Sequence, residues 1–283
     1  MKMKYLRTCF VVFCCLMLVG VSLSQEKEEK KDTSAANENS LQKDIEKVKC
    51  KNKERLEAVK KLFISKGAKE DEIKITGSKS IKNLSVVKKG VSDETIIIGA
   101  HYDELGGGCG VIDNWSGIVI IANLYKRIKA FKTKKTYKFV AFDKEEKGLI
   151  GSKKMAGSIP KEERTKYCSM VNFDSFGLSY PQTLKNISSE KLIVLAKDVA
   201  KGMKMPFTAV NISGASSDSA SFKSKKIPAI TVSGLSNNWQ KILHTRNDKI
   251  EKVNIKSVYY GYLFGLNFIA KLDAAECSAF RKK

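Results

Sequence analysis

The segment Thr95-Ile96-Ile97-Ile98-Gly99-Ala100 is a continuous apolar run, and it constrains the fold more than any other part of the chain. A strand with one face in water alternates apolar and polar residues, whereas a strand covered on both faces is apolar throughout. A Gly-rich loop follows this run, and apolar residues then recur at helical spacing from about Ser116 to Ala130. The order predicts a buried strand in a sheet that is covered by helices.

The alternation of strands and helices continues along the chain, and its 283 residues suit one large domain or at most two small ones. Further strands are predicted at residues 73–75, 84–87, 137–142, 170–173, 208–212 and 229–232, and further helices at 41–65, 188–203 and 255–274. Strands that alternate with helices indicate a mostly parallel sheet. We therefore expect an α/β fold, a single globular domain with a central mixed, mostly parallel sheet covered by helices on both faces.

The N-terminus has the pattern of a signal peptide. Three basic residues precede an apolar run from Cys9 to Val21, and small residues follow at Ser22 and Ser24. The run is shorter than the roughly 20 residues of a membrane span, although an uncleaved anchor is an alternative. We predict a signal peptide at 1–24, a disordered polar leader at 25–42, the folded domain at 43–276 and a basic tail at 277–283. Secretion to an extracellular or periplasmic space follows.

Four cysteines lie beyond the predicted signal peptide, and they are Cys50, Cys109, Cys168 and Cys277. An even number in an exported chain permits two disulfides, and the sequence leaves all three pairings open. None of the four has the close spacing of a cysteine zinc site.

The charge balance is strongly basic, because 52 Lys and Arg face 30 Asp and Glu and give a net charge of +22. Such a charge favours acidic substrates or anionic surfaces, or simply gives a well-solvated surface. The lysines are scattered and no basic motif interleaved with aromatic residues occurs, so nucleic-acid binding is not expected.

Polar residues of ligand type follow the predicted strands at the edge where α/β sheets carry their sites. His101 and Asp103 end the first buried strand, and Asp103 is placed to accept the second ring N–H of a metal-binding His101. Asp113 precedes the helix that begins near Ser116. Asp113 is interpreted either as a helix cap or as a carboxylate that bridges two metals.

Glu145 and Glu146 directly follow the apolar strand that ends at Phe142. Because neighbouring residues of an extended chain point to different sides, one glutamate can bind a metal while the other acts as a base. An acidic pair on the surface is the alternative. Asp174 ends the strand at 170–173, and His244 lies in a loop before the last helix. Each of these two alone also suits a cap or a core residue.

The set is more specific than its members. Two imidazoles, two carboxylates and a bridging carboxylate give each of two zinc ions a histidine, a carboxylate and a share of Asp113, and leave an open position for water or substrate. Two zinc ions about 3.5–4 Å apart lower the pKa of a shared water and polarise a carbonyl. The set therefore predicts a hydrolytic site with two zinc ions.

Five motifs occur in the order H-x-D, G-x-x-D-N-x-S-G, E-E followed by G-L-x-G-S, N-x-D and H-T. With these motifs, roughly residues 45–275 resemble the co-catalytic zinc aminopeptidases related to bacterial leucyl aminopeptidase. The resemblance implies that residues 43–276 form a zinc peptidase catalytic domain with two zinc ions per chain. Its substrates would be peptides with a free N-terminus.

The resemblance also implies a role for each site residue. His101 and Asp174 would bind one zinc, Glu146 and His244 would bind the other, and Asp113 would bridge them. Glu145 would be the general base and Asp103 would orient His101. In the family's S-D-H-x-x-F segment, Ser219 stands here in place of the histidine. We expect a monomer without stable membrane insertion once the signal is cleaved.

Three alternatives remain at the level of the sequence. Glutaminyl-peptide cyclotransferases share this fold, but they work with a single zinc and lack the D-N-x-S-G and G-L-x-G-S segments. An inactive binding domain is disfavoured because all five ligands and the base are present. A polyanion-binding protein is the third alternative, since the positive charge also suits steering of acidic peptides or association with an anionic surface.

Overall fold

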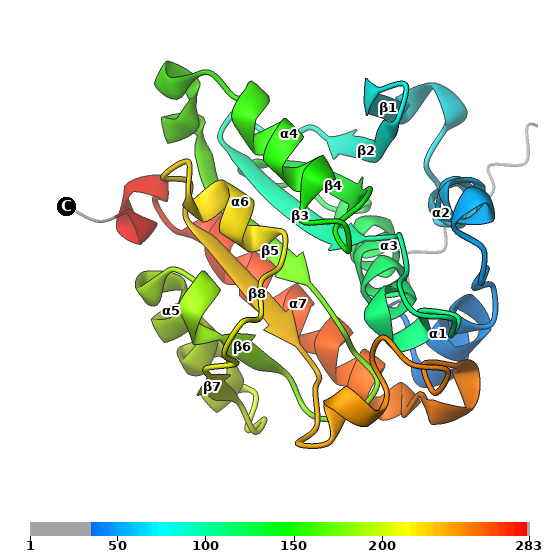
Figure 1. Cartoon of the computed structure of the whole chain (residues 1–283). Coiled ribbons are helices and arrows are strands. Elements are labelled where there is room, and N and C mark those ends of the chain that lie inside the picture. Colours follow the sequence, from blue (N-terminus) through cyan, green and yellow to red (C-terminus); the bar gives the residue numbers. More distant parts are fainter. Residues whose placement is uncertain (1–34, 282–283) are drawn as a thin grey trace, which may run out of the picture. The chain divides into compact units, whose positions relative to one another are not determined.

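The computed structural model describes residues 35–281, and these residues fold around one eight-stranded sheet (Figure 1). The predicted signal peptide at 1–24 lies outside the described residues. None of the described helices is long and apolar enough to cross a membrane. The strands, in chain order, are β1 Ile73–Ser78, β2 Ile81–Lys88, β3 Thr95–His101, β4 Thr136–Phe142, β5 Tyr167–Phe173, β6 Gln182–Leu184, β7 Thr208–Val210 and β8 Ala229–Ser233.

The sheet is mixed, with the order β1-β2-β4-β3-β5-β8-β6-β7. Its centre, from β4 through β3 and β5 to β8, is parallel, whereas β1, β2 and β6 introduce antiparallel pairs. The central parallel strands therefore end at the same edge of the sheet, as the arrowheads in Figure 1 show. This confirms the predicted mixed, mostly parallel sheet.

The helices are α1 Glu38–Ile45, α2 Asn52–Ser65, α3 Ser116–Lys129, α4 Ile150–Ser158, α5 Glu190–Gly202, α6 Ser219–Lys223 and α7 Ile255–Ala274. Alternate residues of β3 enter two different cores. Ile96 and Ile98 pack in the larger core together with residues of α1, α2, α3, α5 and α7. Ile97 packs in a smaller core with residues of α4 and α6. Both faces of the sheet are covered, which explains why β3 is apolar throughout.

Two boundary predictions need correction. The leader predicted to residue 42 overlaps α1, which begins at Glu38 with Asn37 as a capping residue and buries Leu41 and Ile45. The predicted basic tail is also part of the folded unit. Cys277–Phe280 forms a 3₁₀ helix, Phe280 is buried, and Arg281 donates hydrogen bonds to main-chain carbonyls. Leu41, Ile45 and Phe280 complete the core, so the folded unit includes residues 38–42 and 277–281.

Two disulfides join the four cysteines in the pairs Cys50–Cys109 and Cys168–Cys277. The second closes a separation of 109 residues and ties the C-terminal 3₁₀ helix to β5. The first joins the segment between α1 and α2 to the loop that follows β3. That segment also interrupts the single helix predicted at 41–65, which is two helices in the structure.

Candidate metal centre

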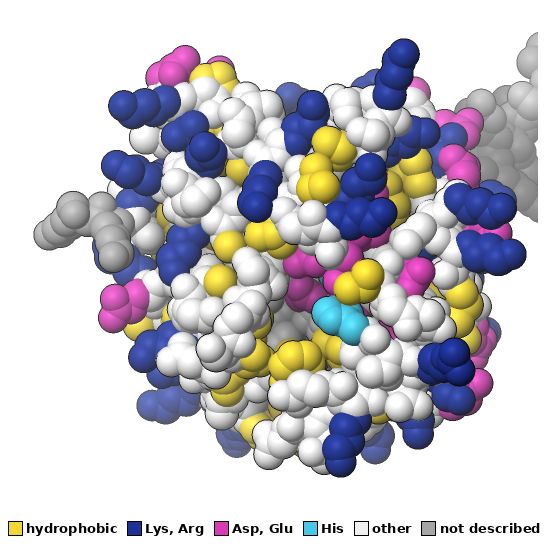
Figure 2. All heavy atoms as spheres, in the orientation of Figure 1, with side chains coloured by type: hydrophobic (Ala, Val, Ile, Leu, Met, Phe, Trp, Pro, Cys, Tyr) yellow, Lys and Arg dark blue, Asp and Glu magenta, His cyan; other side chains and the backbone are white. Residues whose placement is uncertain are grey.

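The predicted ligands come from separate loops that meet at the carboxyl edge of the central strands. His101 is the last residue of β3, the Glu145–Glu146 pair follows β4, and Asp174 follows β5. Asp113 and His244 reach the same place from the loops before α3 and α7. All six residues line one cavity of about 390 Å³. Figure 2 shows a histidine beside acidic side chains at a hollow in the surface.

Asp113 stands at the centre, with each carboxylate oxygen facing a different histidine. Its Oδ1 lies 3.1 Å from Nε2 of His101, and its Oδ2 lies 3.0 Å from Nε2 of His244. On the first side, Asp174 Oδ1 lies 3.7 Å from His101 Nε2. On the second, Glu146 Oε2 lies 3.1 Å from His244 Nε2. The residues thus form two groups, each with one imidazole, one carboxylate and one oxygen of Asp113.

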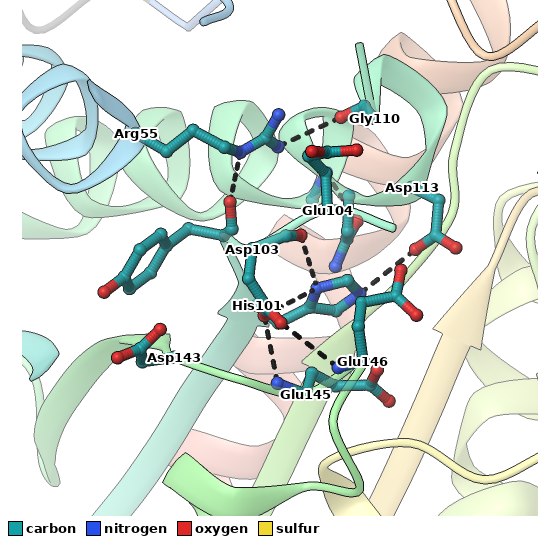
Figure 3. Close-up of polar contacts among 12 residues, drawn as sticks. Arg55, His101, Asp103, Glu104, Gly110, Asp113, Asp143, Glu145 and Glu146 are labelled. Carbon is teal, nitrogen blue, oxygen red and sulfur yellow. Dashed lines mark hydrogen bonds and ion pairs between the residues drawn. The ribbon is translucent and has the colours of Figure 1, made fainter. Parts of the chain in front are cut away.

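Asp103 connects His101 to the glutamate pair (Figure 3). Its Oδ1 lies 3.5 Å from Nδ1 of His101, whose ring also approaches the Asp103 carbonyl at 3.2 Å. The same carboxylate accepts the main-chain N–H groups of Glu145 and Glu146, at 2.9 and 3.2 Å. One buried side chain therefore orients the imidazole and holds the loop after β4 in place.

Asp248 is a residue of the site that the sequence did not reveal. Its Oδ1 accepts the N–H groups of Val111 and Ile112 at 2.8 and 2.7 Å, and its Oδ2 accepts that of Asp113 at 3.0 Å. The side chain thereby fixes the backbone that carries Asp113. The only sequence signal for its role is that it follows His244 by four residues, so both residues belong to one loop.

Asn114 ties the same backbone to β5. Its side chain donates to the carbonyl of Phe173 and accepts the N–H of Ser175, at 2.9 and 3.1 Å. Since these two residues flank Asp174, Asn114 sets the position of Asp174 relative to Asp113. Ser217 also donates a hydrogen bond to Asp174. The ligand-type side chains are thus held by protein hydrogen bonds.

The electrostatics of the site favour a bound cation. Burial, together with Asp218, Asp174 and Asp113, raises the pKa of Glu145 to about 10, although His101 opposes this shift. Hydrogen bonds to Asp113 and Glu146 raise the pKa of His244 to about 10. The carboxylates repel one another and draw protons or cations into the cavity.

The donor set fits zinc on the chemistry of its atoms. Imidazole nitrogens and carboxylate oxygens are both zinc ligands in proteins. In addition, Oε1 of Glu146 is buried without a hydrogen-bond partner. The ligand atoms of His101, Asp113 and Glu146 lie within 4.8 Å of one another, as do those of His101, Glu145 and Asp174. A metal ion would satisfy atoms that the protein leaves without partners.

The rest of the cavity is largely apolar. Its wall is formed by Leu184, Ile212, Leu235, Trp239 and Leu243, with small residues between them. No Lys or Arg is among the described residues that line it. The cavity thus combines an acidic end with an uncharged apolar wall.

Comparison with known proteins shows similarity to peptidases. A family model described as peptidase family M28 matches residues 83–259. The chain is 30% identical to aminopeptidase Y of Saccharomyces cerevisiae over 150 residues, which are 50% of this chain and 28% of the yeast protein. It is 28% identical to a probable leucine aminopeptidase of Arthroderma otae over 242 residues, 78% of this chain and 65% of that one. The chain thus matches less than two thirds of each of these relatives.

Solved structures of two kinds share the fold. LapA of Legionella pneumophila superposes with a TM-score of 0.72 at 21% identity, over 84% of this chain and 74% of LapA. A glutaminyl cyclase from an Acidobacteriales bacterium also gives 0.72, at 15% identity, over 89% of this chain and 98% of the cyclase. At such identities the superpositions establish the fold alone.

Proposed function

Because the chain belongs to peptidase family M28, we propose that it is a secreted zinc aminopeptidase that removes N-terminal residues from peptides with two zinc ions in one site. The single observation that carries this proposal is the division of the site by Asp113. Each of its oxygens lies near 3 Å from a different histidine, and each side has its own further carboxylate. This arrangement suits two metal ions that share one ligand.

The ligand assignment follows the two groups. His101 and Asp174 would hold one zinc, Glu146 and His244 the other, and Asp113 would bridge them. When bound, the two ions would lower the pKa of a water molecule and polarise the scissile carbonyl. Asp103 would keep His101 in the tautomer that presents Nε2 to the metal.

Glu145 is the proposed general base. It lies beside the ligands, and its N–H is held by Asp103 while its carboxyl group lines the cavity. Without metal, burial and the neighbouring carboxylates raise its pKa to about 10, so it holds a proton at neutral pH. Beside two bound zinc ions this pKa would fall, and the carboxylate would be free to accept a proton. We assign to it the transfer of a proton from the attacking water to the leaving amine.

The cavity supports an aminopeptidase substrate. Its carboxylates attract the positively charged N-terminal amine. Its apolar wall suits an apolar first side chain, since burial of a charged side chain there would lack a partner. Export is supported by the two disulfides, which persist in oxidising compartments. A monomer, and any association with anionic surfaces, stay predictions from the sequence.

A glutaminyl cyclase is the second candidate, because a cyclase shares this fold over almost the whole of its chain. The two activities differ in the products they release. An aminopeptidase releases the first residue. A cyclase joins the amine of an N-terminal glutamine to the carbonyl of its own side chain and releases ammonia.

The deciding experiment follows peptide masses. The purified protein is incubated with zinc and a mixture of free-amine peptides, one of which begins with leucine and another with glutamine. We expect stepwise loss of single N-terminal residues, which a chelator abolishes and added zinc restores. Loss of only one ammonia from the glutamine peptide would replace the proposal by the cyclase, and unchanged masses would overturn both.

Matched variants separate the site from the rest of the protein. Glu145→Gln keeps the shape of the side chain but cannot accept the proton, so we expect it to bind zinc and lose turnover. Glu163→Gln makes the same chemical change at an exposed residue outside the cavity. It should retain full activity.

A further inference from the structure

The loop between His101 and Asp113 is attached to α2 and to the segment that precedes it, which lie outside the residues matched by the family model. Cys109 in this loop forms the disulfide with Cys50. Asn52 exchanges two hydrogen bonds with the backbone of Glu104, both of 3.0 Å. The N-terminal part of α2 and the segment before it thus contact the loop that joins two proposed ligands.

Arg55 of α2 makes the most extensive of these contacts (Figure 3). Its side chain is completely buried. Nε donates to the carbonyl of Tyr102, Nη1 donates to that of Cys109 at 2.8 Å, and Nη2 donates to that of Gly110 at 3.0 Å. Nη1 also donates to the carbonyl of Lys49 at 3.0 Å. All these partners are main-chain atoms.

These carbonyls mark the two ends of the loop. Tyr102 directly follows His101, and Gly110 lies three residues before Asp113. One planar guanidinium therefore fixes the distance between the backbone at Tyr102, next to His101, and the backbone at Gly110, which leads to Asp113. No other described side chain donates hydrogen bonds to both Tyr102 and Gly110.

Arg55 also carries charge toward the acidic site. Burial lowers the pKa of its guanidinium to about 10, while Glu104, Asp103, Asp248 and Asp113 raise it, so the group is charged at neutral pH. A buried charge without hydrogen bonds is costly, and here main-chain carbonyls accept from four of the five N–H groups. The residue is therefore well suited to hold a defined loop geometry.

We propose that Arg55 is a positioning residue for the metal centre, which sets zinc affinity by holding the His101–Asp113 loop in its binding conformation. The inference rests on the proposed function, since it requires His101 and Asp113 to bind metal. Loss of a group that orients ligands from outside the first coordination shell typically costs 10–100-fold in metal affinity. A lysine at residue 55 would keep the positive charge, but its single ammonium group cannot donate to the carbonyls at both ends of the loop.

Two variants and one control test this proposal. Arg55→Met removes the charge and the donors and keeps an apolar stem. Arg55→Lys keeps the charge alone. Lys135→Met is the control, because Lys135 is also buried and donates to main-chain carbonyls of Asp273 and Ala275. It precedes β4, whereas the site lies beyond the other end of that strand.

Zinc binding to metal-free protein is measured by calorimetry, with thermal unfolding of each variant for comparison. We expect affinity about 10–100-fold lower in Arg55→Met, an intermediate value in Arg55→Lys and the wild-type value in Lys135→Met. The visible spectrum of the cobalt(II)-loaded protein should also change in Arg55→Met, since it reports ligand geometry.

The outcomes separate the positioning role of Arg55 from the proposed function of the site. Wild-type affinity and an unchanged cobalt spectrum in Arg55→Met would overturn the positioning role. An equal loss of affinity in Lys135→Met would also overturn it, because general destabilisation would then explain both. If Arg55→Met does not fold, the affinity of Arg55→Lys decides. A wild-type protein that binds no zinc would refute the proposed function itself.

Discussion

Gly106 allows the loop after β3 to pass close to the segment that carries His244. A Cβ atom at residue 106 would lie 2.7 Å from the carbonyl carbon of His244. Nonbonded carbon atoms prefer about 3.5–4.0 Å, so Gly106→Ala must separate the two segments by about 1 Å. His244 Nε2 lies 3.0 Å from Asp113 Oδ2 and 3.1 Å from Glu146 Oε2. A shift of this size exceeds the roughly 0.2 Å tolerance of metal–ligand distances.

We therefore expect Gly106→Ala to weaken binding of the zinc that Glu146 and His244 would hold, and to lower kcat/KM by about 100-fold, the usual cost of a misplacement near 1 Å. The measurements are calorimetric zinc titration of the metal-free protein and hydrolysis of a peptide that begins with leucine. Thermal unfolding of the metal-free variant gives the separate cost to the fold.

Gly107→Ala is the matched control. Both glycines have a positive φ, +103° at Gly106 and +81° at Gly107, so alanine strains the backbone at either residue by about 1–3 kcal/mol. No heavy atom lies within 4 Å of a Cβ at residue 107. Equal losses of zinc affinity and activity in the two variants would show that backbone strain, and not contact with His244, is responsible.

Three further predictions concern other parts of the chain. An N-terminal leucine should exceed an N-terminal lysine in kcat/KM by at least about 100-fold because the cavity wall is apolar, and comparable values in matched peptides would refute this. Burial alone would raise the pKa of Asp44, but hydrogen bonds from Asn123, Lys47 and Lys66 hold it below its usual value. The stabilisation is fully present above about pH 3.9 and is lost as the pH falls through the lower pKa of the folded state. Asp44→Asn should therefore lower the free energy of unfolding by about 2 kcal/mol at pH 7 and leave it unchanged in strong acid. Chemical unfolding at a series of pH values checks this. Replacement of Cys168 and Cys277 by alanine should lower the free energy of unfolding by about 4 kcal/mol, since the disulfide closes a separation of 109 residues, and a loss under 1 kcal/mol would contradict the loop-entropy argument.

The sequence predicted those elements whose pattern is long or whose environment is uniform. The last helix was predicted at 255–274 and occupies Ile255–Ala274, where a long apolar stripe coincides with a capping Asn254. β6 and α6 were missed because three and five residues are too few to display a period. α4 was also missed, because the residues that it buries, Gly151, Ser152 and Ala156, are small and form no apolar stripe. The break between α1 and α2 was missed as well. The break lies where Cys50 forms the disulfide with Cys109 and the carbonyl of Lys49 accepts a hydrogen bond from Arg55. Neither contact can be recognised from the neighbouring sequence.

The candidate site shows the same division. The side chains that bear the proposed chemistry stand in recognisable motifs, and the structure brings them together. Among the residues that hold them in place, Asp103 stands in the first motif and was predicted to orient His101. By contrast, Arg55 and Asp248 were not recognisable. Arg55 lies among lysines and glutamates in a polar helix, so it looks like a surface residue, although it is completely buried. Asp248 likewise acts on main-chain groups more than a hundred residues away, and a contact of that kind depends on the finished fold.

The position of the ligands on separate loops has a consequence for the order of folding. The donors extend from His101 to His244, and Asp113 meets its partners only after β3, β4, β5 and the segment before α7 have come together. Contacts of such long sequence separation form late, because chain entropy must be lost before they can stabilise anything. The metal therefore cannot serve as a nucleus for this sheet. It would bind a nearly complete protein, so a shortage of zinc during synthesis should reduce activity without reducing the yield of folded chains.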